Sequence, residues 1–570
     1  MELPRWQLED ILDPKDTDRI IAEIEARVAK IETLEKRFSS TMPAKLFADT
    51  IIELERINRA LSKIGSYASD HFNENTKDQA AIAFKNRIEA LGADCETKLL
   101  FIDQRWKRFD EKNAARLLKT TPAFGYYLRK LRALRPHTLS EAEEKVVTIK
   151  DVNGVDALGT VFSILTDGFT YLFDGKEVGV SELQRHWRSP DASVRKAAYT
   201  ALLEKYQANK EVLAEIYTHI ADDWRREAAL RTYPGPISVR NKANDLPDEA
   251  VRALLNVCRK NSPVFQEYFR KKAKILKMPR LTRFDLYAPL GKDATSVPYE
   301  QAVAKTLAAM REFHPRFEQG ARRIVEQGHI HARPQKSKYT GAYCDTPAPD
   351  VTPYILLNYT GEANSVKTLA HELGHGVHSI LAEHHHMFHQ HAPLPVAETA
   401  STFAELLLHE RLRKEDPKLA RTLAMMQLDD FYATIGRQSW FVIFEETAHE
   451  MIGRHASGEE LSATYLSQLR EQFGSAVDVP ELFQNEWLYI PHIFHSPFYC
   501  YAYSFGSLLS LSLYGKYRKD SRYAEKIVDL FGKGGSESPG AMVKAAGFDV
   551  ADERFWQSGF DVIRQMIDEL

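Results

Sequence analysis

The stretch KTLAHELGHGVHSIL at residues 367–381 constrains the fold more than any other part of the sequence. Two of its histidines, His371 and His375, are four residues apart. On an α-helix this spacing puts both imidazoles on one face, where they can share one metal ion. A helix is expected on independent grounds, because Asn364 or Ser365 can cap its start. An apolar stripe follows the same segment at helical spacing and is formed by Val366, Leu369, Ala370, Leu373, Val377, Ile380 and Leu381.

The other residues of this motif indicate what the metal would do. Glu372 is offset from the histidines by about a hundred degrees around the helix, which places its carboxylate beside a metal-bound water and not on the metal. Gly374 and Gly376 are poor helix formers, so they predict close approach by other backbone or by substrate. The H-E-x-x-H pattern therefore predicts a catalytic zinc site with Glu372 as its base.

A catalytic zinc ion needs a third protein ligand and one open position. Residues 381 and 395, where other H-E-x-x-H enzymes place the third ligand, are Leu and Pro. Glu398 is the better candidate, because it starts a second predicted helix, VAETASTFAELLLHERL, on which Glu405 shares its face and can support the site. The alternative is that Glu398 only satisfies a helix dipole. His378 can likewise support the metal site, or it can have only a helix-packing role.

Most of the chain shows helical amphipathic spacing, and 570 residues exceed the size at which one core keeps growing. We therefore expect a mainly α-helical protein of two or more lobes. Residues 1–185 are predicted to form an N-terminal helical region, and residues 186–570 the catalytic region.

The exception to helix lies at about residues 281–360, just before the motif. Residues 283–287, 339–344 and 354–359 are rich in aromatic and β-branched side chains and are separated by clusters that contain Pro and Asp. They predict a small β-sheet beside the motif helix. An exposed strand edge there can pair with an extended peptide, with Tyr343 and Tyr354 as substrate contacts, although internal strands are an equal alternative.

Charge and cysteine content exclude several classes of partner and compartment. The formal net charge is −3, so no electrostatic argument favours nucleic acid or an anionic membrane. The four cysteines form no CxxC pair, which favours a reducing compartment. No signal peptide and no long apolar run is evident, so we expect a cytoplasmic protein.

The motif block resembles a known family. HELGHGVHS followed by VAETASTFAE is similar to the zinc motif and third-ligand helix of the M3 peptidases, especially the oligoendopeptidase F branch. RWQLEDILD, LRPHTLSEAEEKV, SVRKAAY, GAYCDTPAPDVTPYILLNYTG and GGSESPGAMVKAAGFD extend the resemblance over most of the chain. It implies a two-lobed helical clamshell around a deep channel. It also implies one zinc ion per chain on His371, His375 and Glu398, with Glu372 as general base.

A tyrosine-rich segment, PHIFHSPFYCYAYSFG at residues 491–506, resembles the region from which this family supplies transition-state hydrogen bonds. Tyr501 is our first choice for the oxyanion donor and His492 the second. Tyr499 and Tyr503 remain open as substrate contacts or as the donor itself. Packing of these aromatic residues in a core is an equal alternative for each.

The function expected from this pattern is a zinc-dependent endopeptidase that hydrolyses internal bonds of short peptides by Glu372-assisted attack of zinc-bound water. The protein would be a monomer or a homodimer. A zinc carboxypeptidase on a similar helical frame is an alternative, but no basic cluster near the motif would obviously bind a terminal carboxylate. A catalytically dead, helical peptide-binding protein is the alternative from a different class, and the intact Glu372 argues against it.

Overall fold

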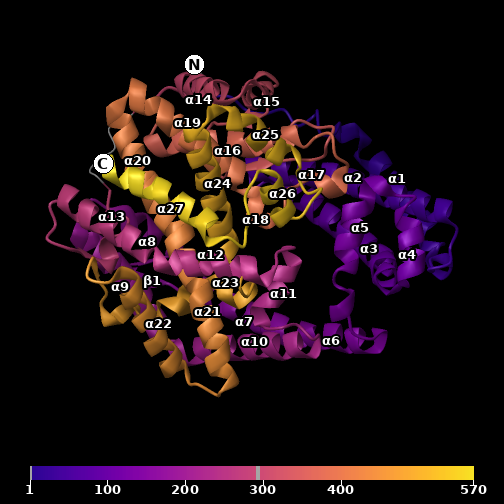
Figure 1. Cartoon of the computed structure of the whole chain (residues 1–570), viewed down its shortest axis with the longest axis horizontal. Helices are drawn as coiled ribbons and strands as arrows, with labels where there is room; N and C mark the ends of the chain where they lie inside the picture. The colour runs from indigo at the N-terminus through magenta and orange to yellow at the C-terminus, as the bar shows by residue number, and fades with distance from the viewer. Residues whose placement is uncertain (1–2, 290–295) are drawn as a thin grey trace. The chain divides into compact units, whose positions relative to one another are not determined.

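The computed structural model describes residues 3–289 and 296–570 (Figure 1). Most of them are helical, which confirms the mainly α-helical class. The chain divides into two compact units, both discontinuous in sequence: unit 1 is Met1–Arg135, Thr295–Ala420 and Lys516–Gly547, and unit 2 is Pro136–Ala294, Arg421–Gly515 and Phe548–Leu570. The predicted boundary after residue 185, between an N-terminal helical region and the catalytic region, falls inside unit 2. This division of the sequence stays a prediction. None of the described helices is both long enough and apolar enough to cross a membrane.

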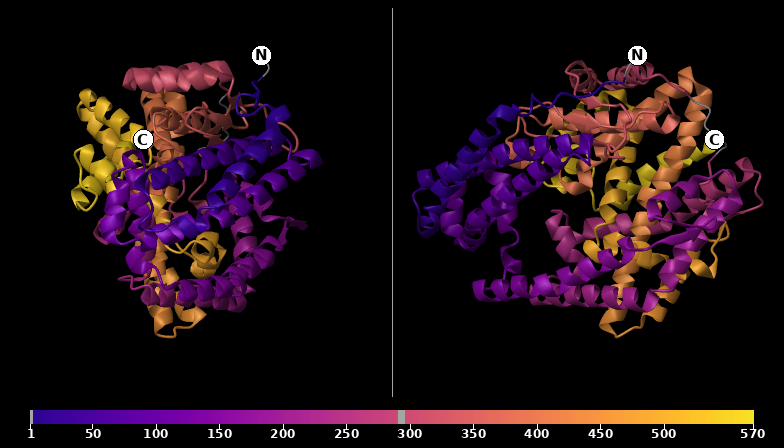
Figure 2. Two further views of the ribbon diagram at one scale, coloured as in Figure 1. Left: turned by 90° about the vertical axis from the view of Figure 1, so that its right-hand side faces the viewer. Right: turned by 180° about the vertical axis from the view of Figure 1, so that it is seen from behind.

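Unit 1 is built mainly from helices. Its two longest, α2 and α3, lie side by side in every view (Figures 1 and 2). The helices of this unit are α1 (Thr17–Glu32), α2 (Ala44–Glu74), α3 (Gln79–Arg108), α4 (Glu111–Leu118), α5 (Gly125–Arg132), α14 (Tyr299–Phe313), α15 (Pro315–Glu326), α16 (Ala363–Leu381), α17 (Met387–Gln390), α18 (Leu394–Ala397), α19 (Thr399–Glu415), α25 (Ala524–Gly532) and α26 (Pro539–Ala545). The apolar stripes of α1, α2 and α3 form one buried core.

A three-stranded sheet in unit 1 packs against the motif helix α16. Its order is β4 (Ile330–His331), β6 (Tyr354–Leu356) and β5 (Tyr343–Asp345). β4 pairs with β6 in parallel, and β5 pairs with β6 antiparallel. The expected small sheet beside the motif helix is therefore confirmed, with β6 as its central strand and β5 at an edge.

Two details of the strand prediction need correction. Residues 283–287 are not a strand: Arg283–Asp285 form the 3₁₀ helix η6, because the Asp285 carboxylate accepts hydrogen bonds from the backbone N–H and hydroxyl of Thr282 and caps that turn. In the YTGAYC segment, pairing begins only at Tyr343, because the Asn358 side chain donates to the carbonyls of residues 339 and 341 instead. Local side-chain hydrogen bonds thus overrode the strand pattern.

Unit 2 is also mainly helical and contains α6 (Glu141–Asn153), α7 (Val155–Asp167), α8 (Val180–Arg185), α9 (Ala192–Gln207), α10 (Lys210–Leu230), α11 (Pro236–Ala243), α12 (Asp248–Lys260), α13 (Ser262–Ile275), α21 (Gln438–Gly453), α22 (Gly458–Phe473), α23 (Pro491–His495) and α27 (Glu553–Asp568). α20 (Pro417–Phe431) and α24 (Tyr501–Lys519) have residues in both units. β1 (Tyr171–Phe173) and β2 (Lys176–Val178) form a hairpin whose turn, Asp174-Gly175, has positive φ at both residues. β3 (Leu281–Thr282) pairs in parallel with β7 (Val477–Asp478).

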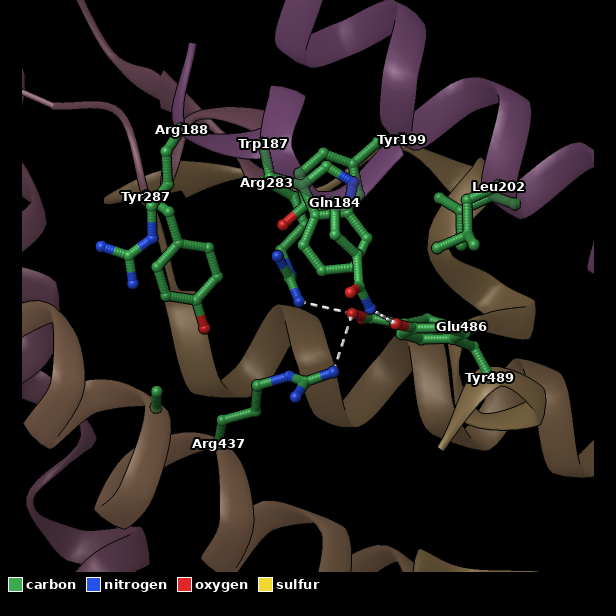
Figure 3. A pocket seen from close by; sticks show the side chains of 12 residues that line it. Gln184, Trp187, Arg188, Tyr199, Leu202, Arg283, Tyr287, Arg437, Glu486 and Tyr489 are labelled. Atoms are coloured by element: carbon green, nitrogen blue, oxygen red, sulfur yellow. Dashed lines mark hydrogen bonds and ion pairs between the residues drawn. The ribbon is translucent and has the colours of Figure 1, made fainter. Parts of the chain in front are cut away.

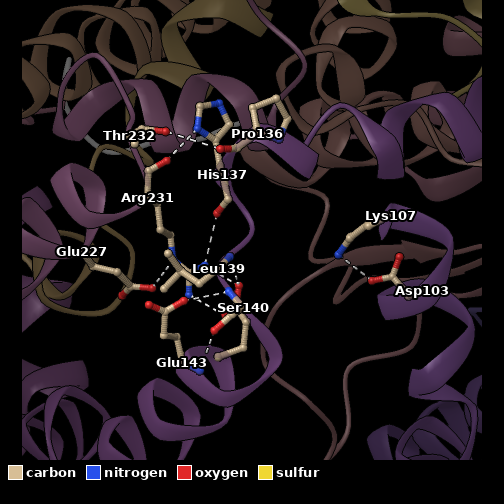
Figure 4. A network of polar contacts seen from close by, with 11 residues as sticks. Asp103, Lys107, Pro136, His137, Leu139, Ser140, Glu143, Glu227, Arg231 and Thr232 are labelled. Carbon is tan, nitrogen blue, oxygen red and sulfur yellow. Dashed lines mark hydrogen bonds and ion pairs between the residues drawn. The ribbon is translucent and has the colours of Figure 1, made fainter. Parts of the chain in front are cut away.

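Helix α6 begins with a capping box and is tied to α10 by an arginine (Figure 4). Ser140 and Glu143 satisfy each other's free backbone N–H groups at the helix start. Arg231 donates to both carboxylate oxygens of Glu144, at 2.7 and 2.9 Å, and to Glu227 at 2.6 Å. This bidentate geometry anchors the exposed α6, none of whose residues is buried.

Candidate metal centre and active site

Helix α16 carries the motif, and its glycines set how closely its neighbours approach. A Cβ atom added at Gly374 would lie 2.6 Å from the Cα of Ser401 and 2.7 Å from the carbonyl oxygen of Ala400, both on α19. A Cβ atom at Gly376 would lie 2.3 Å from a side-chain carbon of Ile324 on α15. The expected close approach therefore comes from α19 backbone at Gly374, and it brings α19 against the histidine face of α16.

The third predicted ligand lies where α19 begins. Glu398 is the N-cap residue of α19, directly after the short helix α18. The Ser401 hydroxyl contacts both the backbone carbonyl and the Oε2 atom of Glu398, at 2.9 and 3.0 Å. The Glu398 side chain is thus held at the start of α19. This helix, the second one predicted, begins one residue after Glu398.

The three predicted metal ligands converge on one point. The Nε2 atoms of His371 and His375 lie 3.3 and 3.2 Å from Oε2 of Glu398. All three ligand atoms lie within 4.8 Å of one another. Figure 1 shows α16 and α19, the helices that supply them, lying against each other, and their close packing agrees with this view.

The donor set fits a zinc ion. Two neutral imidazole nitrogens and one carboxylate oxygen are a common catalytic set for zinc. A tetrahedron with bonds of about 2.0–2.1 Å has ligand-to-ligand edges of about 3.3 Å, close to the two distances measured here. Three carboxylates, those of Glu372, Glu398 and Glu405, surround the histidines and supply negative charge that a cation would neutralise.

Two further residues orient the ligands. Nδ1 of His371 lies 2.6 Å from Oε1 of the buried Glu405, which leaves Nε2 to face Glu398. His378 hydrogen-bonds the backbone at Ala397, the residue before Glu398. Burial lowers the pKa of His378 to about 3, so it is neutral at ordinary pH. Glu405 therefore contacts the candidate ligand His371 directly, whereas His378 contacts the backbone next to the candidate ligand Glu398.

Charges in the site shift the pKa values of the ligands strongly in the metal-free chain. Burial alone would lower the pKa of His371, but hydrogen bonds to Glu398 and Glu405 raise it to about 10. Burial opposes ionisation of Glu398, yet the contacts with both histidines hold its pKa far below its usual range. The carboxylates that favour a proton on His371 would equally favour a metal cation at this point.

Glu372 has the surroundings that a general base requires. Its side chain is buried, with 5% of the residue exposed, and its Oε2 atom has no hydrogen-bond partner in the protein. Burial raises the pKa of this carboxyl group above its ordinary value. An unpartnered carboxylate oxygen beside a candidate metal centre is a known functional exception to the rule that buried polar groups are paired.

The two predicted strand tyrosines differ in their surroundings. The hydroxyl of Tyr343 on edge strand β5 donates to Asp70 at 2.7 Å and accepts from Asn73 at 2.9 Å. Tyr354 on the central strand β6 is fully buried, donates to the carbonyl of Gln7 and stacks on a histidine ring. Tyr354 therefore has a packing role, and nothing around it supports the expected contact with substrate.

In unit 2, the tyrosine-rich segment separates the predicted residues into two environments. Tyr501, the first residue of α24, is fully buried, and its hydroxyl accepts a hydrogen bond from Asn244 at 2.9 Å. Tyr499, Tyr503 and His492 are only partly buried and form an aromatic cluster in which the Tyr503 hydroxyl lies 3.4 Å from Nε2 of His492. The first choice for an oxyanion donor is thus the least accessible of the three tyrosines.

One residue of the site escaped the sequence reasoning. The ammonium group of Lys367 lies 3.6 Å from Oε2 of Glu405, the carboxylate that orients His371. The available signal was its spacing, since Lys367 precedes His371 by four residues and so shares its helix face.

Comparison with known proteins gives matches over most of the chain. Residues 186–562 match the family described as peptidase family M3, and residues 106–170 match the one described as oligopeptidase F. An oligoendopeptidase F homolog of Borreliella burgdorferi is 26% identical, covering 95% of this chain and 92% of its own. The oligopeptidase PepF of Bacillus subtilis is 24% identical, covering 99% and 86%.

Solved structures share the fold. The crystal structure of oligoendopeptidase F from Enterococcus faecium covers 97% of this chain and 98% of its own, with a TM-score of 0.71 and 21% identity. The structure of PZ peptidase A covers 96% and 97%, with a TM-score of 0.75 and 17% identity. Because the family match spans well over half of the sequence, the chain belongs to peptidase family M3 and is a peptide hydrolase of the oligoendopeptidase F type.

Proposed function

We propose that the chain is a zinc-dependent endopeptidase that hydrolyses internal bonds of short peptides, with His371, His375 and Glu398 as ligands of one zinc ion. The observation that carries the proposal is the convergence of both imidazole Nε2 atoms on one oxygen of Glu398, next to the buried carboxylate of Glu372. Short peptides as substrates are supported by the names of the relatives, which are oligoendopeptidases and oligopeptidases.

The chemistry divides between the metal and the chain. Zinc, when bound, would polarise the peptide carbonyl and make water more acidic. Oε2 of Glu372 accepts a proton from the attacking water and returns it to the nitrogen of the leaving amine. The unpartnered Oε2 atom of the buried Glu372 leaves this carboxylate free to accept that proton. Glu405 keeps the proton of His371 on Nδ1, so that the lone pair of Nε2 is available.

A hydrogen-bond donor for the tetrahedral oxyanion is proposed to come from Tyr503 or Tyr499, with His492 as their partner. Their partial exposure supports this choice over Tyr501, whose hydroxyl is buried against Asn244. A phenol suits the task because it donates at neutral pH without adding a charge. The resemblance of residues 491–506 to the corresponding region of the family is the second support.

An extended substrate is proposed to pair with β5, the edge strand that carries Tyr343. Main-chain hydrogen bonds to a strand edge do not depend on side chains, so they suit broad specificity. β6 lies between two strands and has no free edge, which argues against the YILLNY segment in this role. We further propose a cytoplasmic monomer or homodimer, since all four cysteines are unpaired thiols.

Replacing Glu372 by Gln tests the proposal, because the amide keeps the shape and removes the base. Zinc content should stay at about one ion per chain, while hydrolysis of an internally quenched peptide should fall at least about 10²-fold, as expected for loss of a general base. The same peptide with an amidated C-terminus should be cut as fast as the free acid by the wild-type enzyme. Strong preference for the free acid would indicate the carboxypeptidase alternative, and absence of hydrolysis in the zinc-loaded wild type the peptide-binding one.

A further inference from the structure

Unit 2 contains a pocket of about 250 Å³ that the proposed chemistry does not use (Figure 3). Short helical turns from distant parts of the sequence line it: Trp187 and Arg188 from η5 (His186–Arg188), Arg283 from η6, Arg437 from the π-helical turn η7 (Tyr432–Arg437) and Glu486 from η8 (Glu481–Tyr489). π-Helical turns interrupt regular helices mostly at functional positions. We name this site the arginine pocket.

Positive charge exceeds negative charge in the arginine pocket. Three arginines, Arg188, Arg283 and Arg437, line it together with one acidic residue, Glu486. Figure 3 shows Arg283 and Arg437 both reaching the Glu486 carboxylate, and their Nη2 atoms lie 2.5 and 3.5 Å from the same oxygen, Oε1. The other oxygen of Glu486 accepts from the Tyr465 hydroxyl at 3.2 Å. Arg188 lies 3.9 Å from the carboxylate of Asp430, so Glu486 is the carboxylate that Arg283 and Arg437 share, and one negative charge cannot neutralise both of them.

The lining also has more hydrogen-bond donors than acceptors. Arg283 is 1% exposed, yet its Nε and Nη1 atoms have no acceptor in the protein. Nε of Arg437 and Nε1 of Trp187 are also buried without a partner. Among the described residues that line this pocket, every buried unpartnered atom is a donor. A buried charged donor without an acceptor is unfavourable, so a ligand rich in acceptors would be favoured.

The remaining walls are flat and apolar. Trp187 stacks on Tyr199 with ring centroids 4.6 Å apart, and the Arg188 guanidinium lies over the ring of Tyr287 at 5.7 Å. Faces of this kind bind a planar or apolar ligand body, while the arginines would bind its charged end. A volume of about 250 Å³ is smaller than drug-sized ligand pockets, so the occupant should be a small molecule.

We propose that the arginine pocket binds a small organic carboxylate, with its oxyanion on Arg283 and Arg437 and its body between the aromatic walls. Planar guanidinium groups match carboxylate oxygens better than ammonium groups do, which fits the presence of arginine and not lysine at these positions. The proposal does not rest on zinc, because none of the three proposed zinc ligands lines this pocket and all of its lining residues belong to unit 2.

Calorimetric titration of the full chain tests the proposal with benzoate, succinate and inorganic phosphate, each at an ionic strength fixed with sodium chloride. Benzoate should bind at one site per chain, and Arg437→Gln should weaken it at least about tenfold, as the loss of one charge-assisted pair does. Glu486 keeps its 2.5 Å contact with Arg283 in this variant, so the fold should survive, and circular dichroism verifies that. Trp187→Phe keeps an aromatic wall and removes one donor, so a smaller weakening is expected.

Two control variants distinguish binding in the arginine pocket from binding elsewhere on the chain. Arg259→Gln removes the same charge from an exposed arginine of unit 2 that, like Arg437, lies over an aromatic ring, and it should leave the benzoate affinity within twofold. His375→Ala removes a proposed zinc ligand, so benzoate bound to zinc would be lost in this variant. Benzoate bound in the arginine pocket should still bind. The proposal is overturned if benzoate and succinate show no saturable binding, because water then satisfies the donors. Binding that ignores Arg437→Gln but vanishes in His375→Ala also overturns it, as does Arg437-dependent binding of phosphate alone.

Discussion

The proposed metal centre in unit 1 and the tyrosine-rich segment in unit 2 both contain several histidine side chains, yet they differ in how the backbone fixes each side chain. His371 and His375 lie on one uninterrupted helix, α16, so their spacing alone determines that they share a face. Residues 491–506 contain the whole of the short helix α23, a turn and the start of α24. Their spacing therefore does not determine which side chains share an environment.

The turn in the tyrosine-rich segment explains this difference. Phe498 has a φ angle of 58°, in the left-handed region that a bulky residue rarely adopts. Its backbone N–H donates to the buried carboxyl group of Glu445 at 2.8 Å, and its ring packs on His449. This contact holds the strained residue in place, and α24 then starts with Tyr501 turned into the core. In a uniform helix, residue spacing alone determines which side chains share a face. At a strained turn, a contact with a residue distant in the sequence determines it.

The largest effect is expected from removing the residue where the two histidines converge. Glu398→Ala should lower zinc affinity more than Glu405→Ala, because Glu398 faces both Nε2 atoms and Glu405 only orients one ring. Loss of an outer-shell partner such as Glu405 typically costs about 10–100-fold in metal affinity. Zinc titration against a competing chelator measures both. Equal losses in the two variants would mean that Glu398 is not a ligand.

A large effect on turnover is expected within the tyrosine-rich segment. Tyr503→Phe or Tyr499→Phe should lower kcat about 10²–10³-fold, the usual loss when one oxyanion donor is removed. Tyr501→Phe should leave kcat within a few-fold and lower only the free energy of unfolding, by about 1 kcal/mol, for its lost bond to Asn244. Steady-state kinetics and urea unfolding of the three variants separate these outcomes. A large loss of kcat in Tyr501→Phe would mean that the buried tyrosine, and not a partly buried one, supplies the oxyanion donor.

A moderate effect is expected from the contact that joins α16 to α19. Gly374→Ala places a methyl group against α19 backbone, which cannot rotate away as a flexible side chain can. Overpacking of this kind typically costs about 1–3 kcal/mol. Because the displaced helix carries Glu398, zinc affinity should fall together with stability. Gly92→Ala on the exposed side of α3, where nothing lies within 4 Å, is the matched control and should do neither. A stable Gly374→Ala protein with normal zinc affinity would show that α19 is not held by this contact.

These cases show which parts were predictable from the sequence. The helix class, the motif helix and the neighbouring sheet follow from periodicity and local spacing. Glu398 was placed with the histidines by its position at the start of a second predicted helix and by the resemblance to the family. Arg283–Asp285 escaped because a capping hydrogen bond replaced strand pairing, and the burial of Tyr501 escaped because it depends on Asn244, far away in the sequence. The arginine pocket could not be predicted either, because its charged residues come from four turns that are far apart in the sequence.

The smallest effect on catalysis, and the sharpest test of the turn, is expected from Glu445. Burial raises the pKa of this carboxyl group to about 8, and Oε2 has no partner, so the folded chain holds a proton there at neutral pH. His449, four residues along the same helix, is neutral because burial lowers its pKa to about 3, so it supplies no compensating charge. The folded state thus binds more protons than the unfolded state between the ordinary glutamate pKa and about 8. The contribution of this group to the free energy of unfolding is fully present below that interval and declines as pH rises through it, by at most about 1.4 kcal/mol per pH unit.

Glu445→Gln keeps an acceptor for the Phe498 N–H and removes the proton, so urea unfolding at pH 5, 7 and 9 should lose that part of its pH dependence while kcat stays within a few-fold. Glu450→Gln on the exposed face of α21 is the matched control and should unfold with the wild-type pH dependence. If Glu445→Gln also unfolds with the wild-type pH dependence, the carboxyl group is ionised in the folded chain, and a charged hydrogen bond holds the strained Phe498.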